Sequence, residues 1–252
     1  MKKLFIAALF LVCFTQAVSA QVVTGRTWEY INLTAVLSPQ WAIVAMPGHR
    51  YEFSRTESYG AAKGNVFHEF FIGPVYTMPL GNFKLKLPVW YYMMGFPTDS
   101  PQSYNMSQNL EIMPIVDYKL NDKITLSNRV IFHNTFYSDA YTDDAQKVGY
   151  SLLIREMLTG SYKLTDNLTA MLADEIFIGA IEDNEAKAKA TGFSASGFQT
   201  NRVYLGVTYN FTPTMSISPQ YVYETNYNLE NVVTSIQNYL YVTFTYVMKC
   251  SK

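Results

Sequence analysis

The sequence has few of the residues that usually carry chemistry. It contains two cysteines and three histidines in 252 residues, and it shows no glycine-rich phosphate loop and no closely spaced His/Cys cluster. No run of eighteen apolar residues occurs after the N-terminal segment, which excludes a helical membrane protein. Only 15% of the residues are charged and the formal net charge is −1, so no nucleic-acid partner is expected. We expect no cofactor, no metal and no catalytic role.

The N-terminal segment has the pattern of an export signal. Lys2 and Lys3 precede an apolar stretch from Leu4 to Phe14, and Val18, Ser19 and Ala20 supply small residues where a signal peptidase cleaves. This stretch is shorter than the roughly twenty residues that span a bilayer. The sequence therefore predicts a cleaved signal peptide over residues 1–20 and one mature domain over residues 21–252. Cys250 is the only cysteine left in that domain, which excludes an intrachain disulfide.

Two-residue alternation of apolar and polar side chains runs along the whole mature chain. Val203, Leu205, Val207, Tyr209 and Phe211 share one side of such a segment, and polar residues occupy the other. We predict strands at 27–36, 41–55, 65–78, 83–95, 107–119, 123–136, 150–163, 168–180, 200–211, 215–227 and 236–247. The breaks between them are alternately short and long. Short periplasmic turns and longer extracellular loops are typical of outer-membrane barrels.

Aromatic residues favour this interpretation over a soluble β-sandwich. The chain has 20 Tyr and 16 Phe, and aromatic girdles flank the membrane band of such barrels. We expect girdle positions near the strand ends at Trp28, Tyr30, Trp41, Tyr51, Phe53, Tyr76, Phe83, Phe132, Phe136, Tyr137, Tyr162, Phe211, Tyr227 and Tyr246. A sandwich would instead use them as core. The predicted fold is an all-β, antiparallel, up-and-down transmembrane β-barrel of ten to twelve strands.

The bacterial outer membrane is the compartment that these features predict. There the barrel would contact outer-membrane lipid and lipopolysaccharide, would need the barrel assembly machinery during biogenesis, and would be a monomer. Eleven strands nevertheless conflict with the even number usual for single-chain bacterial barrels. Either 27–36 is not a full wall strand and ten remain, or residues 21–30 supply a short twelfth. A tail of six residues after Tyr246 also departs from the usual aromatic C-terminal residue.

Charged residues on the polar strand faces form the candidate site. By alternation we place a lumen charge network at Arg50, Glu52, Glu69, Lys84, Lys86, Glu111, Arg129, Arg155, Glu175, Arg202 and Glu224, with Asp117 and His133 on the same side. Both signs are interspersed, and a charge in a confined space needs a partner. The network therefore predicts either a structural filling of the barrel or a narrow conduit for small solutes.

Two acidic residues break the alternation. Glu156 and Asp174 fall on the apolar side of their strands, next to Arg155 and Glu175. A charge facing lipid at mid-bilayer costs a few kcal/mol, so we expect a β-bulge that turns both acids inward. An acidic site or a cation site at this level is the alternative.

Several short segments resemble a family of uncharacterised Gram-negative outer-membrane barrels, known only as a domain of unknown function. They are Ile154-Arg155-Glu156-Met157, Ala173-Asp174-Glu175-Ile176-Phe177 and Phe198-Gln199-Thr200-Asn201-Arg202-Val203-Tyr204-Leu205-Gly206, together with Trp28 and Arg50. The resemblance covers nearly the whole mature chain and implies an outer-membrane barrel without a known activity. It also implies that Arg155, Glu175 and Arg202 belong to one internal network.

A barrel enzyme that acts on lipid or peptide at the outer surface is the alternative function. Such enzymes need a base beside a nucleophile. His49 and His68 share outward parity on adjacent strands and could approach each other, but no serine lies at a matching position. The longest loop, 181–199, carries Ala, Glu and Lys that favour a short exposed helix, and it could contact a partner.

Overall fold

The computed structural model describes residues 22–56, 64–97, 104–138, 150–181 and 196–250. The predicted signal peptide at 1–20 and most of the loop at 181–199 lie outside these ranges. The described residues form twelve strand segments: β1 (Val22–Val36), β2 (Trp41–Arg55), β3 (Gly64–Leu80), β4 (Phe83–Pro97), β5 (Tyr104–Ile112), β6 (Ile115–Lys119), β7 (Ile124–Ser138), β8 (Ser151–Lys163), β9 (Leu168–Ile181), β10 (Gly197–Thr212), β11 (Met215–Tyr227) and β12 (Val233–Lys249).

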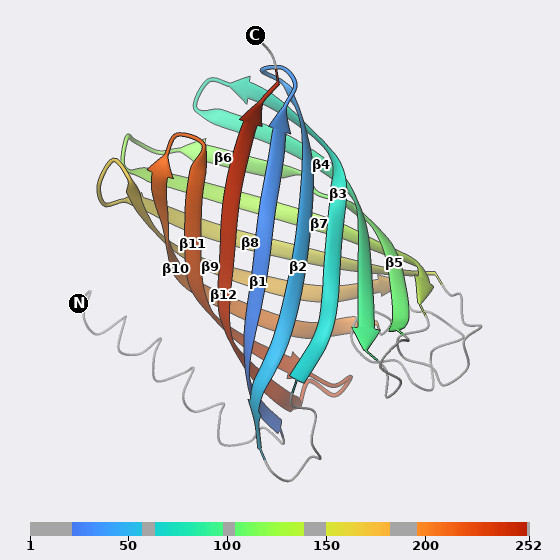
Figure 1. The fold of residues 1–252 in the computed structure, drawn as a ribbon. Coiled ribbons are helices and arrows are strands. Elements are labelled where there is room, and N and C mark those ends of the chain that lie inside the picture. The colour runs from blue at the N-terminus through green and yellow to red at the C-terminus, as the bar shows by residue number, and fades with distance from the viewer. Residues whose placement is uncertain (1–21, 57–63, 98–103, 139–149, 182–195, 251–252) are drawn as a thin grey trace.

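These segments close into one barrel (Figure 1). β5 and β6 both pair with β4 on one side and with β7 on the other, so they occupy one wall position. Their ladders are interrupted at Met113 and Pro114, and proline has no N–H to give to a ladder. The described residues thus form an eleven-position wall, which confirms the predicted all-β barrel of ten to twelve strands. The segment predicted as one strand over 107–119 is broken in two.

The barrel closes through a parallel pair. β1 pairs with β12 in parallel from Val22 opposite Ser235 to Val36 opposite Lys249, whereas every other neighbour in the described wall is antiparallel. A closed ring with alternating directions needs an even number of strands, so an odd number requires one parallel pair. The first strand begins at Val22 rather than 27 and is a full wall strand. Neither the ten-strand nor the twelve-strand alternative is needed.

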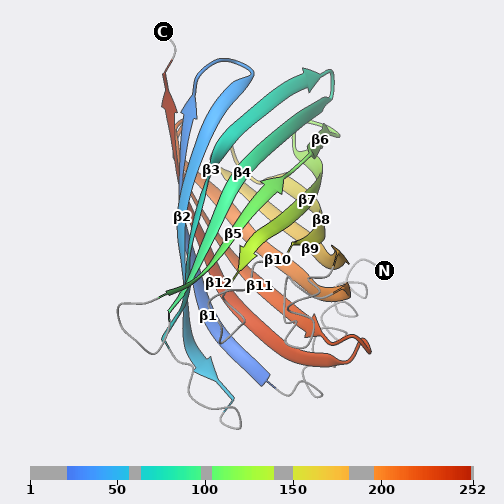
Figure 2. The same ribbon diagram turned by 90° about the vertical axis from the view of Figure 1, so that its right-hand side faces the viewer.

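The two ends of the barrel differ in their connections (Figures 1 and 2). The breaks at 37–40, 81–82, 120–123, 164–167 and 213–214 lie at one end, together with the end of β12. We call this the short-turn end. The breaks at 56–63, 98–103, 139–150, 182–196 and 228–232 connect strands at the opposite end, which we call the long-loop end.

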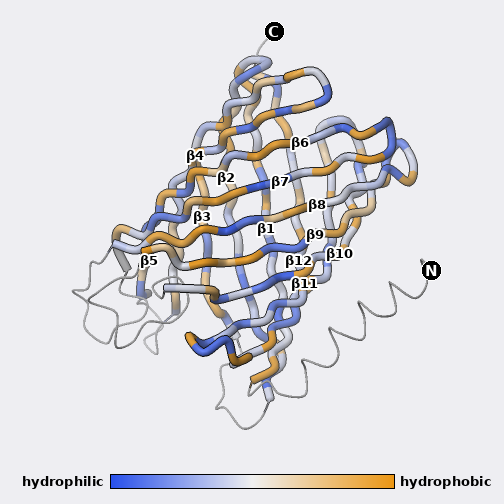
Figure 3. The backbone as a smooth tube through the Cα atoms, turned by 180° about the vertical axis from the view of Figure 1, so that it is seen from behind, coloured by the Kyte–Doolittle hydropathy of each residue, from blue (hydrophilic) through white to orange (hydrophobic). Residues whose placement is uncertain are grey.

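Hydrophobic and hydrophilic residues alternate along many of the strands (Figure 3), and buried positions alternate with more exposed ones along much of the wall. Large apolar residues are exposed on the outside, among them Ile31, Ile43, Leu158, Leu172, Leu205 and Leu240. Trp41, Tyr51, Phe53, Phe83, Phe136, Tyr162, Phe211 and Tyr246 from the expected girdle are also exposed. Trp28 and Tyr30 are not: both are buried in the core. Their expected girdle position was wrong because they share strand parity with Arg26 inside the lumen.

The β-bulge expected near Glu156 and Asp174 is not there. Between β8 and β9 the register runs without a shift from Leu153 to Lys163, and it moves only between Leu152 and Leu153. Glu156 and Asp174 are both exposed on the outer wall. Each is bonded locally: the amide of Asn128 donates to Glu156 at 2.9 Å, and that of Asn201 donates to Asp174 at 3.1 Å. These two acids are therefore accommodated on the outer wall by side-chain hydrogen bonds and not by a bulge.

Register shifts concentrate instead at the long-loop end. Six of the seven shifts between described strands lie there, at Gly25/Arg26, Arg50/Tyr51, Gln108/Asn109, Leu152/Leu153, Phe198/Thr200 and Asn226/Tyr227. The seventh, at Asn210/Thr212, lies at the short-turn end. A bulge increases local twist and redirects the side chains beside it. Arg26 and Arg50 stand directly at two of these shifts, so the bulges help to aim charged side chains into the loop-side part of the lumen.

Candidate functional site: the barrel lumen

An eleven-position barrel is wider than the barrels of about eight strands that ordinary side chains fill. Its lumen therefore needs long side chains to be occupied. Buried residues from β1, β3, β4 and from β8 to β12 form one contiguous cluster that includes Trp28, Tyr92, Tyr204 and Tyr239. Arginine and glutamate side chains reach into this cluster from the surrounding wall.

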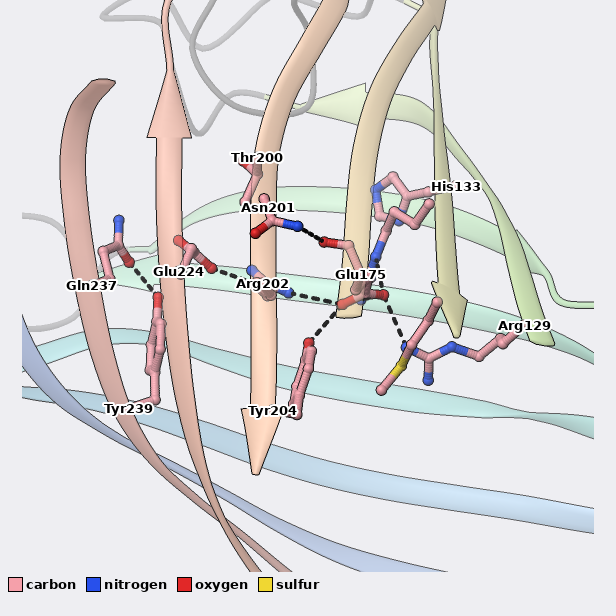
Figure 4. Close-up of polar contacts among 12 residues, drawn as sticks. Arg129, His133, Glu175, Thr200, Asn201, Arg202, Tyr204, Glu224, Gln237 and Tyr239 are labelled. Atoms are coloured by element: carbon pink, nitrogen blue, oxygen red, sulfur yellow. Dashed lines mark hydrogen bonds and ion pairs between the residues drawn. The ribbon is translucent and has the colours of Figure 1, made fainter. Parts of the chain in front are cut away.

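Glu175 is the most connected acid in the lumen (Figure 4). Its carboxylate is fully buried. It accepts hydrogen bonds from Arg129 Nη2 at 2.9 Å, from Arg155 Nη2 at 2.9 Å and from the Tyr204 hydroxyl at 2.6 Å. Arg202 Nη1 lies 3.8 Å away. Three guanidinium groups from β7, β8 and β10 thus share one carboxylate from β9, which links four neighbouring strands.

Glu69 plays the corresponding part on the other side of the lumen. It accepts from Arg50 Nε at 2.7 Å and from the Tyr92 hydroxyl at 2.9 Å, and the Tyr30 hydroxyl also donates to it. Gly48 makes this geometry possible, because a Cβ there would lie 2.0 Å from the Tyr30 ring. The ring can lie across the backbone of β2 and reach Glu69 only because position 48 has no side chain.

Trp28 joins these two sides. The guanidinium carbon of Arg50 lies 3.6 Å from the centroid of the Trp28 ring, and that of Arg202 lies 5.2 Å from it. Arg202 in turn pairs through Nε with Glu224 on β11. We call Trp28, Arg50, Arg202 and their acids Glu69, Glu175 and Glu224 the central layer. Every charge in it has an opposite charge within reach, as a buried ion requires.

Two further buried acids, each with two partners, extend the network. Glu52, fully buried, accepts from Arg26 Nε at 2.8 Å and from Arg55 Nε at 2.6 Å. Glu111 lies 2.8 Å from His133 Nδ1, and Arg155 Nη1 lies 3.6 Å from the same carboxylate. The second acid links β5 and β7 to the central layer through Arg155.

The lysines stand apart from this network. Lys86 Nζ pairs with Asp117 at 2.6 Å, and Ser127 Oγ donates to the same Asp117 at 2.8 Å. Lys84 is exposed at the strand end beside the 81–82 turn. Around them, the inward positions toward the short-turn end carry small hydroxyl side chains such as Thr208 and Ser218, which bond to each other at 2.8 Å. This part of the lumen has smaller and mostly uncharged side chains.

Two cavities meet at the central layer. A cavity of about 580 Å³ lies at the long-loop end, and a smaller one of about 170 Å³ lies deeper in the barrel. Arg50 and Arg202 line both, so these side chains form the partition between them. Trp28 and Trp90 line the smaller cavity, and their buried indole N–H groups have no hydrogen-bond partner among the described residues. We call the larger cavity the vestibule.

The two outward histidines do come together on the outer wall. The rings of His49 and His68 stack with centroids 4.9 Å apart. His49 Nδ1 lies 3.2 Å from a carboxylate oxygen of Glu29, and its Nε2 lies 3.1 Å from the Asn65 side-chain oxygen. No group of three His, Cys, Asp or Glu residues suited to a metal ion occurs within the described ranges. In the same part of the chain, no helix is long and apolar enough to cross a membrane.

Sequence reasoning missed several members of the lumen network. Arg26 is not in the predicted network because it lies one residue before the predicted strand at 27–36. In the structure it belongs to β1 and shares parity with Trp28. Tyr30, Tyr92, Tyr204 and Tyr239 hydrogen-bond to lumen residues. Alternation places Tyr204 on the polar side with Arg202, but none of the four was included in the predicted network. Their inward parity was visible in the sequence. That parity, rather than closeness to a strand end, separates a lumen tyrosine from a girdle tyrosine.

Together these features define a closed β-barrel with a charge-paired, aromatic interior. Residues 25–234 match the family model described as protein of unknown function (DUF2490). The chain belongs to this family, and the match runs from β1 to the start of β12. A comparison with curated proteins found no match.

Proposed function

We propose that this chain is a monomeric outer-membrane barrel whose lumen is closed to passive diffusion and whose vestibule opens at the cell surface. The long-loop end would face outward, and the short-turn end would face the periplasm. Supporting this proposal, the ladder leaves no open edge, as a membrane requires of β-structure. The outer wall also carries exposed Ile31, Leu158 and Leu205, which suit contact with lipid chains.

The central layer carries the proposal that the barrel is closed. An open porin keeps a water-filled lumen, but here Trp28, Arg50 and Arg202 meet in mid-lumen with cation–π distances of 3.6 and 5.2 Å. Moving either Arg50 or Arg202 would separate a buried ion pair, which is costly. We therefore favour a structural or surface-binding role over a conduit for small solutes, and no step of catalysis is proposed.

Cysteine accessibility in intact cells tests location, orientation and closure together. In a Cys250→Ser background, one variant places a thiol in the vestibule with Ser235→Cys, and the other places it beyond the central layer with Ser218→Cys. Both positions carry serines that point inward on neighbouring strands. A membrane-impermeant charged maleimide is added to intact cells and, in parallel, to lysed cells.

We expect the reagent to label Ser235→Cys in intact cells and to label Ser218→Cys only after lysis. Labelling of both in intact cells would show an open pore and would reject the closed barrel. Labelling of neither before lysis would reject the proposed location or orientation. Recording from purified protein in planar bilayers adds a second measurement, in which the wild type is expected to give no discrete conductance steps.

A further inference from the structure

The vestibule has the size and composition of a ligand site. Its volume of about 580 Å³ falls within the ~300–1,000 Å³ range of small-molecule pockets. It is lined by the loop-side ends of strands from both halves of the barrel, and its rim includes Leu229, which is 74% exposed. A molecule arriving at the long-loop end could therefore enter without displacing a strand.

Positive charge dominates the lining of the vestibule. Arg26, Arg50 and Arg202 border it, whereas Glu224 is its only acidic lining residue among the described parts of the chain. Glu224 is already bonded to Arg202 and to the Asn226 amide, which donates at 3.1 Å. A cationic ligand would find no free carboxylate in this lining. The three arginines are paired as well, with Glu52, Glu69 and Glu224, so a preference for an anion depends on the guanidinium N–H groups that these pairs leave unused.

Arg50 offers the best-placed donors for that anion. Its hydrogen bond to Glu69 uses Nε at 2.7 Å, and no hydrogen bond within the described part of the chain engages Nη1 or Nη2. The stacking on Trp28 at 3.6 Å and on Phe67 at 4.4 Å fixes the plane of the guanidinium. A fixed guanidinium with two unused NH2 groups suits bidentate recognition of a carboxylate.

Aromatic rings surround the space above this arginine. Phe67 and Phe96 pack with centroids 5.1 Å apart, and Phe198 and Tyr227 pack at 5.0 Å; all four line the vestibule. Phe177 adds a ring that already lies 4.5 Å from the Arg202 guanidinium carbon. Such rings bind an apolar body and prefer offset or edge contacts with another ring.

We infer that the vestibule binds a small organic acid with an aromatic body, with its carboxylate on Arg50 and its ring among Phe67, Phe96 and Phe198. The inference rests on the proposed function only for the source of the ligand, which would be the cell exterior. The binding itself depends on the folded barrel alone. It can therefore fail while the location and the closed lumen stand, or hold while they fail.

Titration calorimetry of the full mature barrel in detergent, at neutral pH, tests this site with three probes. 3-Phenylpropionate carries both the ring and the carboxylate, 3-phenylpropanamide keeps the ring without the charge, and acetate keeps the charge without the ring. Detergent without protein corrects for partitioning. We expect 3-phenylpropionate to bind measurably, and the amide and acetate to bind at least about tenfold more weakly because each lacks one half of the recognition.

Matched charge-pair variants locate the binding. Arg50→Gln with Glu69→Gln removes the arginine without leaving a buried carboxylate unpaired. Lys86→Gln with Asp117→Asn removes one pair of the same charges near the short-turn end, where the two groups lie 2.6 Å apart. The first double variant should weaken 3-phenylpropionate binding about tenfold or more, and the second should leave it unchanged. Phe198→Ala, which alters only the wall of the vestibule, should also weaken it.

Folding of every variant is checked by circular dichroism and by heat-modifiable migration in gels. Absence of 3-phenylpropionate binding to the folded wild type would overturn the inference. Equal binding of the acid and the amide would also overturn it, since the arginine would then contribute no recognition. If binding survived both Arg50→Gln/Glu69→Gln and Phe198→Ala, the ligand would lie elsewhere and the assignment to the vestibule would be rejected.

Discussion

The two halves of the lumen are built from different side chains on the same strands. Toward the long loops, β10 and β11 place Arg202 opposite Glu224; six residues further along each strand, the same neighbours place Thr208 beside Ser218. The first pair is buried and charged, and the second is partly exposed and neutral. The wall is continuous through both, so the backbone alone does not distinguish the two levels. In the closed barrel that we propose, a few long side chains at one level would close the lumen.

If so, shortening those side chains should open the barrel. In planar bilayers, we expect discrete conductance steps from Trp28→Ala combined with Arg202→Ser and Glu224→Ser, while the wild type remains silent. The triple variant removes the ring and one ion pair but leaves no lone charge from that pair. Thr208→Ala with Ser218→Ala, on the same two strands, should stay silent. Steps in this control or in the wild type would contradict a closure confined to the central layer.

The free energy of unfolding should depend more on charges in the central layer than on charges near the short-turn end. Glu175→Leu leaves Arg129, Arg155 and Arg202 without the carboxylate they share, and breaking a buried ion pair in this way costs about 3–5 kcal/mol. Asp117→Leu removes a partner of Lys86 whose side chain is 33% exposed, and it should cost about 1 kcal/mol or less. Urea-induced unfolding of both variants in micelles measures the difference. Equal losses would show that the two halves contribute alike.

The sequence was sufficient to predict the all-β barrel wall, because the strands follow from a period of two. The strands at 41–55 and 215–227 match the structure at both ends. Alternation could not predict what each charge meets across the lumen. The sharing of Glu175 by three arginines depends on barrel diameter and register. Glu156 and Asp174 were misplaced because their neighbours Asn128 and Asn201 lie on other strands, and no local pattern joins them.

Replacing glycine by alanine at two positions tests how closely side chains pack against the backbone. Gly48→Ala should destabilise the barrel by about 1–3 kcal/mol, as overpacking does, because its Cβ would lie 2.0 Å from the Tyr30 ring that bonds to Glu69. Gly160→Ala on β8 adds a Cβ whose nearest neighbour is 4.0 Å away, and it should be neutral or slightly stabilising. Thermal unfolding of the two variants compares them. A neutral Gly48→Ala would mean that Tyr30 can move without loss of its contact to Glu69.

The smallest effect is expected at the short-turn end, where local pairs take the place of a network. Lys119 Nζ lies 2.7 Å from Asp122, and Lys163 Nζ lies 2.7 Å from Asp166, in two turns of similar sequence. The lysine hydrogen bond lowers the pKa of each aspartate. A lowered pKa gives stabilisation above the ordinary aspartate value, and this is lost as the pH falls through the folded value.

Replacing either lysine by alanine should raise the pKa of the aspartate three residues later, as measured by carboxyl chemical shifts in an NMR titration. Each variant serves as the control for the other. Lys163→Ala should raise the pKa of Asp166 more than the pKa of Asp122, because Lys163 acts on Asp122 only through a weaker charge interaction. Both aspartates are exposed to solvent, so the stabilisation lost with the lysine should be small and unfolding in urea should change little. A clear loss of stability would mean that these turns belong to the same cooperative unit as the central layer, and the two halves would then no longer differ in how they are held together.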